Sequence, residues 1–138
     1  MALQSRFKKP DIFITITANP QWREIRENCD GMNPSHRPDI IVRVFYQKFM
    51  YLLHLITVEH IFGVPVCWVY QVEFQKRGLP HVHLLITLRE QDKIYTPEQL
   101  ERLISAEIPD SSTSPNLRKS VIQFMIHGPC GELNPNSP

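Results

Sequence analysis

Three stretches of the chain have the apolar pattern of β-strands. In residues 12–17, isoleucines alternate with a phenylalanine and two threonines, and an Asn-Pro turn dipeptide follows. Residues 66–75 and 81–88 are rich in β-branched and aromatic side chains. Because a short segment with a glycine and a proline separates these last two stretches, the pattern predicts an antiparallel hairpin.

Three other stretches carry apolar residues at helical spacing. The longest, residues 39–61, has Asp39 as its expected N-cap and is followed by a glycine and a proline that end it. Residues 97–106 follow a capping box with proline at the first helical position. Residues 117–126 form the last predicted helix.

The elements follow one another as strand, helix, strand, strand, helix, helix, and residues 21–38 form a polar loop with room for a short helix. This order is typical of an α+β domain, and a chain of 138 residues has the length of one domain. We therefore predict that helices 39–61 and 97–106 pack on an antiparallel sheet whose central hairpin is residues 66–88.

Composition changes this picture little. Fifteen basic and 14 acidic residues give a net charge of +1, so a nucleic-acid partner must be argued from local clusters. The longest apolar run, residues 49–58, is shorter than the ~20 residues that span a bilayer, and we expect no membrane partner. Three cysteines without a CxxC pair favour reduced thiols over a disulfide framework.

The candidate chemistry lies around the predicted hairpin. Side chains alternate along a strand, so His81 and His83 share one face with Cα atoms about 7 Å apart, close enough for two imidazoles to reach one metal ion. Glu73 falls opposite them if the chain folds back through residues 76–80. Two imidazoles and one carboxylate suit a divalent metal that acts as a Lewis acid. The alternative is that His-x-His on a strand only faces solvent or accepts hydrogen bonds.

Three segments carry a resemblance to a known family. They are residues 13–20 (FITITANP), residues 73–83 (EFQKRGLPHVH, with apolar Val82 between the histidines) and residues 124–131 (FMIHGPCG). In this order they resemble the first motif, the metal-binding motif and a specific segment of the N-terminal helicase-like domain of Helitron transposases. That family belongs to the HUH superfamily of rolling-circle replication nucleases. The resemblance covers nearly the whole chain.

The resemblance implies a HUH/Rep nuclease fold, which is a ferredoxin-like or RRM-like sheet that binds single-stranded DNA. It also implies Mg²⁺ or Mn²⁺ held by His81, His83 and Glu73. In this chemistry the metal polarises the scissile phosphate, and a tyrosine attacks it to give a 5′-phosphotyrosine and a free 3′-hydroxyl. The hydroxyl can prime rolling-circle replication, and the reverse reaction rejoins strands.

Further contacts and partners follow from the same resemblance. Beside a metal, Lys76 and Arg77 in the hairpin turn become candidate contacts to the DNA backbone, although a basic pair in a turn is also common in soluble loops. In the first motif we expect Thr15, Thr17 and Asn19 to contact DNA. The helicase region of a longer parent protein is a second expected partner. A eukaryotic transposon would place the protein in the nucleus.

The nucleophile is where this chain departs from the family, whose nucleophilic tyrosines lie on a helix downstream of the His-Gly-Pro-Cys segment. The four tyrosines of this chain all precede that segment: Tyr46, Tyr51, Tyr70 and Tyr95. We expect packing to explain the first three. We therefore predict an incomplete nuclease domain over residues 1–127, an irregular tail over residues 128–138, and the nucleophilic tyrosine beyond Pro138 in a longer parent.

Three alternatives stay open. His127 and Cys130 have a spacing that supplies half of a structural zinc site, or they are a helix-terminal histidine and an inert thiol. The chain can also be a non-catalytic module for single-stranded nucleic acid, with Phe13, Trp68 and Phe74 as stacking platforms. Finally, it can be an α+β interaction module in which the histidine pair is incidental.

Overall fold

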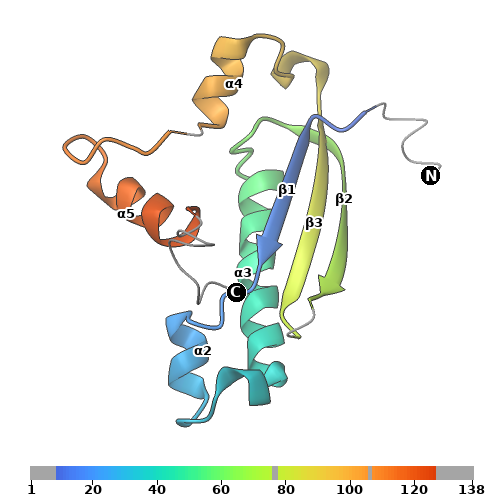
Figure 1. The fold of residues 1–138 in the computed structure, drawn as a ribbon. Helices are drawn as coiled ribbons and strands as arrows, with labels where there is room; N and C mark the ends of the chain where they lie inside the picture. Colours follow the sequence, from blue (N-terminus) through green and yellow to red (C-terminus); the bar gives the residue numbers. More distant parts are fainter. Residues whose placement is uncertain (1–8, 76–77, 106, 127–138) are drawn as a thin grey trace, which may run out of the picture. The chain divides into compact units, whose positions relative to one another are not determined.

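The structure is a computed structural model that describes residues 9–75, 78–105 and 107–126. In chain order its elements are β1 (Ile12–Thr17), α2 (Arg23–Asn28), η1 (Pro34–His36), α3 (Pro38–Thr57), β2 (Pro65–Phe74), β3 (Pro80–Leu88), η2 (Glu90–Asp92), α4 (Pro97–Leu103) and α5 (Pro115–Phe124) (Figure 1). The chain divides into two compact units, one up to Thr96 and one from Pro97.

The first unit contains a three-stranded antiparallel sheet in the order β1-β3-β2. β2 and β3 form the predicted hairpin, with Val72 opposite Val82. β3 is the central strand because β1 pairs with its other edge, where Ile16 also lies opposite Val82. The predicted α+β class with an antiparallel sheet is therefore confirmed, and the more specific HUH/Rep ferredoxin-like fold stays a prediction.

The core lies between one face of this sheet and α3, which runs along it (Figure 1). β3 contributes every second residue to the core: Pro80, Val82, Leu84, Ile86 and Leu88. α3 contributes a stripe at helical spacing: Ile41, Phe45, Phe49, Leu53 and Ile56. Full burial of one such aliphatic side chain stabilises the fold by about 1.5–3 kcal/mol. The alternation that buries these residues directs the intervening residues of β3 to the opposite face.

α3 has the length and composition of a helix that could cross a membrane. Its buried residues form one stripe and the residues between them are exposed or half-buried, as in the core helix of a folded domain. We interpret α3 as such a core helix, and the absence of a membrane partner stays a prediction.

Both ends of α3 differ from the prediction. Asp39 is not the N-cap: Arg37 occupies that position, Pro38 is the first helical residue, and Asp39 in the first turn accepts hydrogen bonds of 3.0 and 2.8 Å from Arg37. These bonds hold the pKa of Asp39 below its ordinary value. The helix ends at Thr57 and not at residue 61, because the chain turns at His60, whose φ of 55° is left-handed.

Residues 21–38 contain the short helix that their pattern allowed. α2 is anchored on α3 by Ile25, which is fully buried, and by an ion pair of 2.8 Å between Glu24 and Lys48. The ammonium group of Lys48 also lies 5.1 Å from the ring centroid of Trp22, within the range of a cation–π interaction. These contacts hold α2, which follows β1 in the chain, against α3.

The second unit contains α4 and α5. α4 ends at Leu103, three residues before the predicted end, and α5 runs from Pro115 to Phe124 instead of residues 117–126. None of the described residues in either helix is buried. The packing of the 97–106 helix on the sheet stays a prediction, as does a single domain over residues 1–127.

Asp92 joins the two ends of the hairpin. Its carboxylate accepts a 2.6 Å hydrogen bond from the Val64 backbone N–H and a 2.8 Å bond from Arg89. These two donors hold the pKa of Asp92 below its ordinary value, the Val64 amide having the larger effect. Gly63 makes the close approach possible: its φ is +100°, and a Cβ there would lie 2.7 Å from Cβ of Asp92.

We expect Asp92→Asn to lower the urea midpoint of unfolding at neutral pH and to have a smaller effect at acid pH. A lowered folded-state pKa contributes stability above the ordinary carboxyl pKa, and this contribution is lost as pH falls through the lowered value. The measurement is urea unfolding followed by circular dichroism at both pH values. Asp30→Asn, at a side chain that is 82% exposed, is the control. An equal loss at both pH values would contradict this role for the Asp92 charge.

Candidate metal and DNA site

The predicted ligands lie together on the sheet face opposite α3, which we call the open face. Its residues come from all three strands: Phe13, Thr15, Thr17, Gln71, Glu73, His81 and His83. Both histidines are half-buried and alternate with buried Val82. Glu73 lies opposite His81 across the hairpin. The predicted placement of the three side chains is thus confirmed, and their role as ligands stays a prediction.

The three side chains are in contact range. Nε2 of His83 lies 3.4 Å from a carboxylate oxygen of Glu73, and the ring centroids of His81 and His83 are 4.5 Å apart in an edge-to-face arrangement. The side chain of His83 is 35% exposed and that of Glu73 is 49% exposed. Solvent, an ion or a ligand can therefore reach the groups directly.

The side-chain types fit a divalent ion better than their present arrangement does. Two imidazole nitrogens and a carboxylate are ligands that first-row divalent metals accept, with positions left for water or substrate. Within the described residues, however, no group of three His, Cys, Asp or Glu side chains is arranged to hold a metal ion. The imidazoles also contact neighbouring groups: one ring nitrogen of His81 is hydrogen-bonded, and the ring of His83 is stacked on another ring.

β1 supplies those neighbouring groups. Thr17 lies opposite His81 in the sheet, and its Oγ is 2.6 Å from Nδ1 of that histidine. The Phe13 ring stacks on the His83 ring with centroids 5.7 Å apart and planes within 2° of parallel. The sequence predicts Thr17 as a DNA contact and does not predict its bond to His81. Alternation places Thr17 on one face of its strand, but it does not reveal which strand lies beside it.

A family model described as the Helitron helicase-like domain at the N-terminus matches residues 1–86. The chain belongs to this family. The match runs from before β1 into the last residues of β3, so all residues of the open face lie within it. No curated protein matches the chain.

The other residues of this Helitron domain that are predicted to contact DNA are not all on the open face. Thr15 is exposed on the open face opposite His83. The side-chain oxygen of Asn19 accepts a 2.8 Å hydrogen bond from the Gln21 N–H, so it shapes the turn after β1. Lys76 and Arg77 lie outside the described residues, as does the predicted zinc pair, His127 and Cys130.

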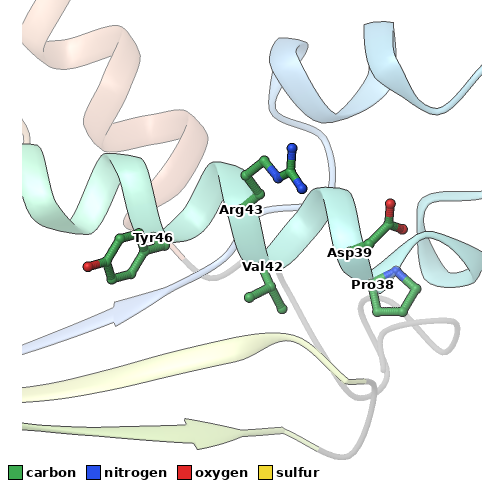
Figure 2. A pocket seen from close by; sticks show the side chains of 5 residues that line it. All are labelled: Pro38, Asp39, Val42, Arg43 and Tyr46. Atoms are coloured by element: carbon green, nitrogen blue, oxygen red, sulfur yellow. The ribbon is translucent and has the colours of Figure 1, made fainter.

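The tyrosines of the Helitron domain are not grouped with the histidines. Tyr46 and Tyr51 are 58% and 66% exposed on α3, so the prediction that packing explains them is wrong. Tyr46 instead lines an open pocket of about 630 Å³ on α3 together with Val42 and Arg43 (Figure 2). Tyr70 does pack, edge-on against Phe49 of α3 at 4.9 Å between ring centroids.

Proposed function

We propose that this Helitron domain binds Mn²⁺ or Mg²⁺ and single-stranded DNA on its open face, and that it serves nicking and strand transfer in a Helitron-type transposase. The proposal is supported above all by one observation. His81, His83 and Glu73, which come from two strands, lie in contact range on an accessible face of the sheet. The family membership gives this arrangement its context.

Each of the three side chains has a defined part in the proposed site. The two imidazoles offer neutral nitrogen ligands, and Glu73 adds the negative charge that offsets part of the ion's charge. A bound divalent ion supplies Lewis-acid polarisation of a phosphate oxygen. Because Glu73 and His83 are about half and one third exposed, a phosphate can approach without rearrangement of the backbone.

The open face also has features that suit single-stranded DNA. Phe13 is 59% exposed beside His83, so a nucleobase can stack on the ring next to the proposed ion. Lys76 and Arg77 of the hairpin turn supply positive charge for the phosphates, according to the sequence. A net charge of only +1 implies weak binding, and contacts of the basic side chains with phosphates make this binding dependent on salt.

A non-catalytic module for single-stranded nucleic acid is the second candidate function. It is favoured by the exposed Phe13 ring and by the lack of an assembled metal group among the residues that the structure describes. The two functions differ in one property: only the first makes DNA affinity depend on a divalent ion and on His81 and His83.

We expect fluorescence anisotropy with a labelled oligonucleotide to show preference for single strands over duplex, with affinity that falls as salt rises. Phe13→Ala should weaken binding about tenfold, since stacking of one base on an aromatic ring contributes about 1–3 kcal/mol. Phe74→Ala is the matched control, because Phe74 is 62% exposed on the other face of the sheet. Equal, salt-insensitive affinity for both DNA forms would exclude the proposed mode.

A further inference from the structure

β1 contributes no proposed metal ligand, yet its side chains contact the imidazoles of both His81 and His83. Thr17 bonds to Nδ1 of His81 at 2.6 Å, and Phe13 stacks on His83 at 5.7 Å between ring centroids. The two contacts come from one strand and one face, and each holds a different degree of freedom of its histidine. The hydrogen bond engages one ring nitrogen of His81, and the stack fixes the plane of the His83 ring.

We propose that β1 is the orienting element of the metal site, with Thr17 and Phe13 as positioning residues for His81 and His83. This inference rests on the proposed function, because it concerns the same two imidazoles. In this inference the side chain of Thr17 positions the His81 ring and is not a DNA contact.

The hydrogen bond can leave His81 ready to bind a metal. A neutral imidazole has one N–H and one nitrogen with a free lone pair. If Nδ1–H donates to the Thr17 hydroxyl oxygen, the lone pair of Nε2 is free for an ion. Histidines that bind metals nearly always donate their other ring N–H in this way, which fixes the tautomer and the orientation of the ring. We assign this direction to the bond between His81 and Thr17.

The stack acts on the ring plane of His83. Phe13 lies opposite Leu85, two residues along β3 from His83, so its ring reaches diagonally to His83. The parallel planes leave the edge of the His83 ring, where Nε2 lies 3.4 Å from Glu73, directed across the hairpin. Since Phe13 is 59% exposed, its replacement removes the stack without opening a cavity in the core.

The first test replaces Thr17 in the full chain. In the metal-free protein, ¹⁵N NMR of the histidine rings should show His81 as the Nδ1–H tautomer. In Thr17→Val, His81 should lose this preference for the Nδ1–H tautomer. Mn²⁺ affinity by calorimetry should fall about tenfold in Thr17→Val, as expected for the loss of a group that orients a ligand. Thr17→Ser keeps the hydroxyl and should restore both the Nδ1–H tautomer of His81 and the Mn²⁺ affinity. Thr57→Val is the control, since its hydroxyl bonds only within α3, to the Leu53 carbonyl.

The second test replaces Phe13. Phe13→Leu should weaken Mn²⁺ binding a few-fold, the effect expected for one stacked pair, whereas Phe13→Tyr keeps the stack and should match the wild type. Phe74→Leu, at an equally exposed ring on the other face, should leave Mn²⁺ affinity unchanged.

The outcomes separate this inference from the proposed function. If the wild type binds Mn²⁺ and both Thr17→Val and Phe13→Leu bind it equally well, the inference is overturned while the metal site stands. If the wild type binds no Mn²⁺, the proposed function fails. In that case the NMR tautomer decides the inference by itself: an Nε2–H tautomer of His81 overturns it.

Discussion

Replacing His81 and His83 together by alanine is expected to abolish Mn²⁺ binding in a calorimetric titration. The two imidazoles supply two of the three proposed ligands, and Glu73 alone is a single carboxylate that is 49% exposed and in competition with water. Both histidines are only half-buried, so the double variant should keep the buried face of β3 and its fold. Unchanged circular dichroism would verify that the loss concerns the site.

The same titration should show weaker binding as the pH is lowered, because a protonated imidazole has no lone pair for a metal. The matched control is the double variant His36→Ala/His54→Ala, at two exposed histidines of η1 and α3, where His54 also lies near a carboxylate, 3.7 Å from Glu59. Calorimetry that gives the same heat for the wild type and for His81→Ala/His83→Ala would rule out the metal site.

With Mn²⁺ present, this chain is expected to leave single-stranded DNA intact and to form no covalent adduct. Cleavage through a phosphotyrosine requires a tyrosine positioned at the metal. Tyr46 and Tyr51 lie on α3, which covers the face opposite the histidines, and Tyr70 points toward the same helix. The Tyr95 hydroxyl donates a hydrogen bond to Glu90, which raises its pKa and so disfavours the nucleophilic phenolate.

Denaturing gel electrophoresis of a labelled oligonucleotide, with mass spectrometry of the protein, measures both products. A longer chain that carries the tyrosine helix of the family should form the adduct, and His81→Ala in that chain should abolish it. An adduct mapped to any tyrosine of the present chain would show that a nucleophile reaches the site from the helix side or from the segment after β3.

Much of the site could be predicted because it depends on local rules. Alternation along a strand puts His81 and His83 on one face, and a short turn brings Glu73 opposite His81. The same rules predicted the hairpin and the apolar stripe of α3. The ends of the helices were less predictable. Asp39 has the chemistry of an N-cap, yet the Arg37 side chain and Pro38 place the cap two residues earlier.

The amino-acid sequence by itself thus determined the elements, the hairpin and the shared face of the candidate ligands, since each depends on side chains that are close along the chain. Only the tertiary structure decided that β1 pairs with β3. Thr17 and His81 are 64 residues apart, and a period-two pattern states which face a residue occupies but not which strand lies beside it. That long-range pairing, driven by burial of Ile12 and Val82 against α3, brings Thr17 and Phe13 to the histidines.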